Sequence, residues 1–312
     1  MTTATNPLDA CGVARALTSH SDDFATVTLA QQLSNGVADH RGRIELGSYA
    51  VLVDTVGGMP FVAHIEPGFG VVQSRLSFAT AGHPPAPDAA IVATATLRDR
   101  LADFGCTTVE VSTADRLVAA VQVRSVRTGR MFDPELLRAA GIALEPAATL
   151  AAPQGAARTR DGAHAVELPP AIDPVLDGVS IIDAIAAQRM SIGPFAQLLG
   201  CSLTRAEQQL TMRCTPQQWM SNALGTMHGG VIAALAAQAV SFAGQLATAP
   251  GGDYRVSDLT IDFFRSPALD AGDVVVVTDP VRVGRRVATM AATMTTEDGT
   301  PLAQTSASVR FE

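Results

Sequence analysis

The feature of this 312-residue sequence that most restricts its fold is an order of segments that occurs twice. In the C-terminal half, a strand-like segment at residues 202–213 precedes an apolar helical segment at residues 231–247, and about four strand-like segments follow. The same order is present earlier, with residues 47–56 as the helical segment. Corresponding positions lie 183 to 186 residues apart, so the sequence predicts a domain that was duplicated and then diverged.

The segments that follow each predicted helix have the periodicity of strands. In residues 256–264, every second residue from Leu259 onward is apolar, which is typical of a strand with one buried face. One long helix followed by antiparallel strands in each copy indicates the α+β class. We expect the two sheets to pair edge to edge into one continuous sheet, because this removes one exposed edge strand from each copy.

These segments divide the chain into three parts. We expect a first domain at residues 1–130, a linker with a short helix at residues 131–177, and a second domain at residues 178–312. Residues 141–177 are rich in alanine and proline, a composition that does not sustain a regular element.

Composition and charge exclude several classes of protein. Hydrophobic residues make up 47% of the chain and charged residues 17%, which argues against disorder. The formal net charge is -8, with 22 basic residues against 30 acidic ones, and no basic stripe is present. A protein that binds nucleic acid usually has such a stripe, so we expect no nucleic-acid partner.

The location of the protein follows from its cysteines and apolar segments. The four cysteines have no metal-ligand or disulfide spacing, so we expect no metal, no cofactor and a reducing cytoplasm. The first residues lack the pattern of a signal peptide. The uncharged run at residues 231–250 contains Gln238 and Gln245 and has no basic flanks, which favours a buried helix over a membrane span.

The sharpest motif is Asn222 followed six residues later by His228-Gly229-Gly230, directly before the long apolar helix. Two glycines at the start of a helix let a ligand approach the backbone and leave N–H groups free. Those amides and the helix dipole favour negative charge that develops in a transition state. The alternative is that Asn222 and His228 only brace the loop.

This stretch resembles the signature of PaaI-type hotdog-fold acyl-CoA thioesterases, and the resemblance covers about residues 180–312. It implies tandem hotdog domains, each an antiparallel sheet wrapped around a long central helix. It also implies that the Gly229 amide holds the oxyanion, while Asn222 and His228 place the substrate carbonyl or water. The family has an acid nine residues after the histidine, and here that position is Ala237.

The first copy supplies the missing acid. Aligning residues 45–55 with the second copy places Asp54 opposite Ala237, and it places Glu45 and Asp39 opposite His228 and Asn222. Because relatives build their sites across a dimer interface, the resemblance implies one composite site. In it, Asp54 faces Asn222, His228 and Gly229, whereas the opposite site is inert.

Further site residues and partners are expected as follows. Gly230, Arg285 and Arg286 are candidates for substrate binding, and the two arginines could meet the phosphates of coenzyme A. The fused chain is expected to form a homodimer. The main alternative function is a non-catalytic acyl-CoA-binding hotdog protein, a sensor or scaffold. A hotdog hydratase is a second alternative, but its loop pattern is not found here.

Overall fold

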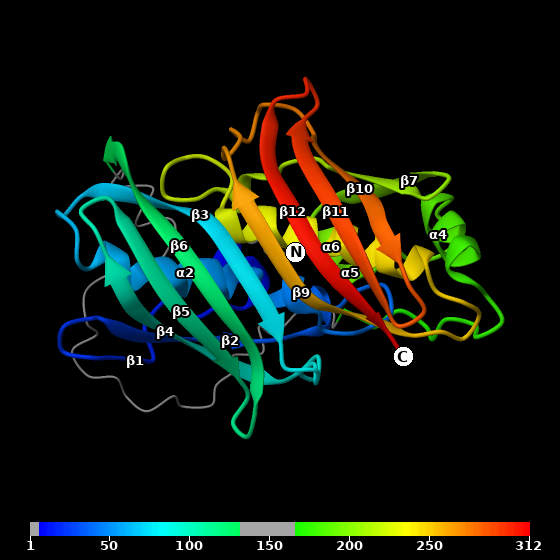
Figure 1. Ribbon diagram of the computed structural model, residues 1–312, viewed down its shortest axis with the longest axis horizontal. Coiled ribbons are helices and arrows are strands. Elements are labelled where there is room, and N and C mark those ends of the chain that lie inside the picture. Colours follow the sequence, from blue (N-terminus) through cyan, green and yellow to red (C-terminus); the bar gives the residue numbers. More distant parts are fainter. Residues whose placement is uncertain (1–5, 132–165) are drawn as a thin grey trace.

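The computed structural model describes residues 6–131 and 166–312. Within these residues all strands form one antiparallel sheet, in the order β1-β2-β4-β5-β6-β3-β9-β12-β11-β10-β8-β7 (Figure 1). The first six strands are β1 (Ser19–His20), β2 (Thr26–Gln32), β3 (Phe69–Thr80), β4 (Ala90–Arg100), β5 (Phe104–Ser112) and β6 (Leu117–Met131). The last six are β7 (Cys201–Ala206), β8 (Gln209–Cys214), β9 (Tyr254–Phe263), β10 (Val274–Val283), β11 (Val287–Thr296) and β12 (Pro301–Phe311).

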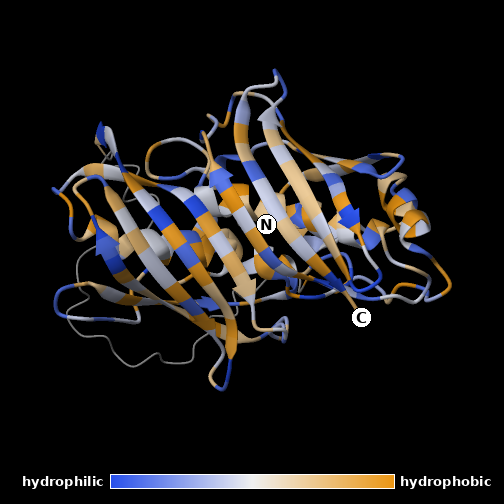
Figure 2. Cartoon of the chain, in the orientation of Figure 1, coloured by the Kyte–Doolittle hydropathy of each residue, from blue (hydrophilic) through white to orange (hydrophobic). Residues whose placement is uncertain are grey.

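Each half of the sheet wraps one long helix, α2 (Ala50–Val62) or α6 (Gly229–Leu246) (Figure 1). The remaining helices are short: α1 (Pro7–Cys11), α4 (Gly178–Ala186), α5 (Pro194–Leu198) and the 3₁₀ turns η1 (Asn35–Val37), η2 (Leu46–Tyr49) and η3 (Gln218–Met220). Apolar and polar residues alternate along the strands, so each strand turns one face toward a helix (Figure 2). This is the predicted tandem hotdog fold of the α+β class.

Both central helices are apolar around their whole circumference, as expected for helices enclosed by a fold. By length and composition α6 could cross a membrane, yet 94% of it is buried inside the protein. The run at residues 231–250 is therefore part of the core, as the sequence predicts.

The two halves join through strands β3 and β9, which pair antiparallel from Arg75 opposite Asp262 to Ala79 opposite Asp258. The guanidinium of Arg75 also forms an ion pair with Asp262 across this junction. The predicted edge-to-edge pairing of the two sheets is thus confirmed, and neither β3 nor β9 is left as an exposed edge.

Two predicted elements differ from the structure. Residues 202–213, expected as one strand, form the hairpin β7–β8, with Glu207 at a φ of 54° in its turn. The helix expected at residues 47–56 begins with η2 and runs as α2 to Val62, through Gly57, Gly58 and Pro60. The two glycines do not end the helix but let it approach the sheet, since a Cβ on Gly57 would lie 2.6 Å from Val123.

The linker is only partly described. Residues 166–177 lead into α4 without forming a helix, and α4 corresponds to the helix expected at the start of the second domain. The rest of the predicted linker and its short helix lie outside the described residues.

The two copies match in detail at a spacing of 183 residues. In β3 the pairing register with β6 shifts between Gln73 and Arg75, which leaves Ser74 as the extra residue of a β-bulge. In β9 the pairing with β12 shifts in the same way and leaves Ser257 as the extra residue. The duplicated domains therefore share even this irregularity.

Helices α2 and α6 pack against one another, with the start of each against the body of the other. Gly230, at the start of α6, is so close to α2 that a Cβ there would lie 2.5 Å from the Cα of Val51. This contact places the loop before α6 directly beside Asp54 on α2.

Candidate active site

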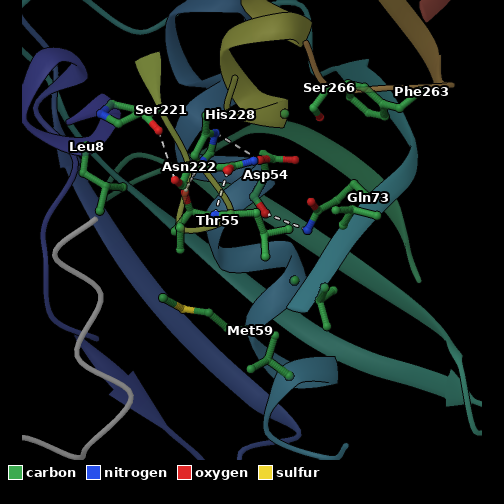
Figure 3. A pocket seen from close by; sticks show the side chains of 18 residues that line it. Leu8, Asp54, Thr55, Met59, Gln73, Ser221, Asn222, His228, Phe263 and Ser266 are labelled. Carbon is green, nitrogen blue, oxygen red and sulfur yellow. Dashed lines mark hydrogen bonds and ion pairs between the residues drawn. The ribbon is translucent and has the colours of Figure 1, made fainter. Parts of the chain in front are cut away.

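A cavity lies between the two domains, where the start of α6 meets the middle of α2 (Figure 3). We call it the Asp54 cavity. Its lining is mostly apolar, with a few polar side chains gathered around Asp54. It is lined by Pro7, Leu8, Asp54, Thr55, Gly58, Met59, Val62, Val71, Val72, Gln73, Ser221, Asn222, Ala223, Leu224, His228, Gly229, Phe263 and Ser266.

Asp54 is the acid of this cavity. It is buried, with 4% of its surface exposed, although it belongs to an otherwise apolar helix. Its Oδ2 lies 3.1 Å from His228 Nδ1, while its Oδ1 is buried without a hydrogen-bond partner among the described residues. Burial raises the pKa of the Asp54 carboxyl, and His228 and the Gly230 N–H act in the opposite direction. An unpartnered carboxylate oxygen facing a cavity can accept a proton from a ligand.

His228 caps the N-terminus of α6, and its Nδ1 lies 3.0 Å from the Gly230 nitrogen, which donates toward it. On the other side of the ring, Nε2 lies 3.4 Å from the Thr55 hydroxyl. Burial lowers the pKa of His228, and Asp54 opposes this effect. A hydroxyl can donate or accept, so Thr55 can partner Nε2 whether His228 carries its proton on Nδ1 or on Nε2.

Gly229 is the first residue of α6 and touches the acid. A Cβ at this position would lie 2.8 Å from Asp54 Oδ1, so no side chain fits beside the carboxylate. The Gly229 N–H is the first of the helix and has no partner within it. With the positive end of the helix dipole behind it, this amide can stabilise an oxyanion formed within reach of Asp54.

Asn222 lines the cavity, but its amide is engaged within its own loop. Its Oδ1 accepts from the Leu224 N–H at 2.8 Å and the Thr226 N–H at 3.1 Å, and its Nδ2 donates to the Thr226 hydroxyl at 3.1 Å. These contacts match the alternative in which Asn222 braces the loop. Its effect on chemistry then acts through the position of His228 and Gly229.

Three residues expected to bind substrate do not line the cavity. Gly230 is packed against α2, and its N–H points toward His228. The Arg286 carbonyl accepts from Phe311, which pairs with Tyr254 at the start of β9, while Phe263 at the end of β9 lines the cavity. Nine residues of strand separate these ends, roughly 30 Å. Arg285 and Arg286 therefore lie at the far end of the sheet from Asp54.

The region related to this cavity by the duplication contains no cavity of comparable size. Arg41 fills it, donating to Asp39 Oδ2 at 2.7 Å, to Glu45 Oε1 at 2.8 Å and to the Tyr254 carbonyl at 2.6 Å. The guanidinium also stacks on the Tyr254 ring, 3.7 Å from its centre. We call these residues the Arg41 cluster. Asp39 and Glu45 thus lie together near Ala237 and away from Asp54.

Sequence reasoning missed Thr55 and Gln73 in the Asp54 cavity. Thr55 follows the acid directly, but helix geometry alone does not show that its hydroxyl meets His228. Strand alternation from the buried Leu76 would point Gln73 outward, and the bulge at Ser74 reverses this. Neither residue gives a signal in the sequence.

No group of three or more His, Cys, Asp or Glu side chains in the described parts of the chain is arranged to hold a metal ion. The chemistry available at this site is that of a carboxylate, an imidazole and helix-terminal amides.

Comparison with known proteins agrees with this geometry. Residues 224–303 match the model of the family described as the Thioesterase superfamily. A solved structure of a conserved protein of unknown function with a hot dog fold, from Alicyclobacillus acidocaldarius, is similar to the chain with a TM-score of 0.60. The two share 14% identity, with 100% of this chain and 99% of that chain covered.

A tesB protein from Mycobacterium avium subs paratuberculosis is also similar, with a TM-score of 0.56 and 11% identity. The likeness covers 91% of this chain and 93% of that chain. No curated protein sequence matches the chain.

At these identities the solved structures establish the fold over the whole chain, which is a tandem hotdog protein. Its second domain carries the match to the Thioesterase superfamily.

Proposed function

We propose that this protein is an acyl-CoA thioesterase that works at one composite site, the Asp54 cavity. The observation that carries the proposal is the unpartnered Oδ1 of Asp54 beside the first amide of α6. One domain supplies the acid, and the other supplies His228 and Gly229. The resemblance to hotdog thioesterases and the match of residues 224–303 support thioester hydrolysis as the reaction.

The reaction follows from these positions. Asp54 Oδ1 takes a proton from water, and the water oxygen bonds to the thioester carbonyl carbon. The carbonyl oxygen becomes an oxyanion, which the Gly229 N–H and the positive end of α6 stabilise. The C–S bond then breaks, the leaving thiolate takes the proton from Asp54, and the products are a carboxylic acid and free coenzyme A.

His228 keeps the acid ready for this role. In the ionised state of Asp54, a proton on His228 Nδ1 can donate to Oδ2, which leaves Oδ1 as the free base. The Thr55 hydroxyl then donates to Nε2 and fixes the ring in this tautomer.

The test is release of free thiol from a panel of straight-chain, branched and aromatic acyl-CoA thioesters. Asp54→Asn keeps the shape but cannot take a proton, so we expect turnover to fall by ~10²–10⁴ with binding retained. Glu110→Gln removes an exposed carboxylate on β5 and is the matched control. Binding of acyl-CoA without turnover in the wild type would instead identify a sensor or scaffold.

A further inference from the structure

Gln73 is a polar side chain in the Asp54 cavity for which the proposed reaction above has no role. The bulge at Ser74 sets its direction, because Gln73 pairs with the fully buried Ser125, whereas the next paired residue, Arg75, lies opposite the exposed Arg124. The bulge therefore turns Gln73 to the inner face of the sheet, toward α2. Bulges of this kind often re-aim a side chain beside an active site.

The amide of Gln73 is held in one orientation. Its Nε2 donates to the backbone carbonyl of Asp54 at 3.2 Å, so the amide end points toward the turn of α2 that holds the acid (Figure 3). Gly58 provides the space, since a Cβ there would lie 2.5 Å from Gln73 Nε2. With Nε2 anchored in this way, Oε1 is the atom of this amide that can accept a hydrogen bond from a ligand in the cavity.

The duplication provides an internal comparison. Position 73 corresponds to Val256, which directly precedes the same bulge in β9 and is 1% exposed. Asp54 corresponds in the same way to Ala237. The copy with the acid has an amide at this position, and the copy without the acid has an apolar side chain.

An attacking water needs two acceptors to be oriented, one for each hydrogen. Asp54 Oδ1 can accept the hydrogen that is transferred. Other polar groups nearby are already engaged, because Asn222 Oδ1 accepts from two amides of its loop and the Thr55 hydroxyl faces His228.

We infer that Gln73 orients the attacking water, with Oε1 accepting the hydrogen that stays on the water oxygen while Asp54 takes the other. No bond to Gln73 forms or breaks, and the oxygen lone pair is left aimed at the thioester carbonyl. This inference rests on the proposed thioesterase activity and adds a second group on the water side of the reaction.

The experiment compares Gln73→Val, the residue found in the other copy, and Gln73→Met, which keeps the length without the amide. We expect kcat to fall roughly ten- to a hundredfold in both, since one hydrogen bond to the reacting water is lost. KM should stay within about twofold, because the water is not part of the bound substrate. Gln122→Val on the exposed face of β6 is the control and should match the wild type.

Melting temperatures of all variants separate folding from chemistry, and Gln73→Met decides the matter should Gln73→Val not fold. A folded Gln73→Met variant with kcat within about twofold of an active wild type would overturn this inference alone. So would a loss expressed only in KM. A wild type that hydrolyses no acyl-CoA overturns the proposed function and this inference together.

Discussion

The Asp54 cavity and the Arg41 cluster come from the same duplicated design, and every difference between them closes the second one. Small or apolar residues that leave room in the cavity have larger or charged counterparts in the cluster. At a spacing of 183 residues the pairs are Asp54 and Ala237, Val62 and Gln245, Val71 and Tyr254, Gln73 and Val256, and Arg41 and Leu224.

The cavity keeps polar groups that are costly to bury, whereas the cluster satisfies its charges. Asp54 Oδ1 has no partner in the described structure, and burial raises the pKa of this carboxyl. In the cluster, Arg41 and hydrogen bonds to its surroundings hold the pKa of Asp39 below its ordinary value, although burial acts to raise it. His40 adds to the cluster by bonding Gln245 and stacking on Phe242.

The comparison indicates that the two sites have taken different tasks. An unpartnered buried acid is retained where chemistry needs it, and a site freed from chemistry can be filled with structure that joins the domains. Arg41 belongs to the first domain and Tyr254 to the second, so the cluster fastens one copy to the other.

The largest effect should come from breaking the cluster. Arg41→Met leaves the buried carboxylates of Asp39 and Glu45 without their cation, so we expect the free energy of unfolding to fall by about 3–5 kcal/mol. Denaturant unfolding measures this loss. Arg43→Met, at a partly exposed ion pair with Asp253, should cost less than about 1 kcal/mol.

Equal losses in the two variants would show that the cluster does not stabilise the fold. Turnover of the folded fraction of Arg41→Met should remain, because Arg41 does not line the Asp54 cavity.

A smaller effect of opposite sign is expected at Asp54. A carboxyl with a raised pKa in the folded state favours folding below its unfolded pKa, and this contribution is lost as pH rises through the folded pKa. Asp54→Asn should therefore melt at a higher temperature than the wild type near neutral pH, and the difference should shrink in acid.

The same shift sets the acid limit of activity. Loss of kcat/KM on lowering the pH should begin above the range of an ordinary carboxyl, as Asp54 gains its proton. An Asp54→Asn variant that melts below the wild type at neutral pH would contradict the view that this acid is kept at a cost.

The smallest effect should follow changes at Arg285 and Arg286, which lie roughly 30 Å along the sheet from the cavity. We expect the double change to glutamine to alter KM for acyl-CoA by less than about twofold, as is usual for surface substitutions away from a site. A large rise in KM would show that coenzyme A reaches this end of the sheet, as their sequence context first suggested.

The sequence by itself determined the duplication, the α+β tandem hotdog fold and the loop at His228. Its register also identified Asp54 as the acid that Ala237 lacks. These features are local in sequence, because periodicity and motif spacing depend on neighbours along one segment. The complementary loss between the two copies needs only an alignment of the chain with itself.

Only the tertiary structure decided how these parts meet. The bulge that turns Gln73 inward depends on the register with β6, and Arg41 reaches Tyr254 across more than two hundred residues of sequence. The distance of Arg285 and Arg286 from Asp54 depends on which end of β9 lines the cavity. Such contacts arise from packing between distant segments, and no local pattern encodes them.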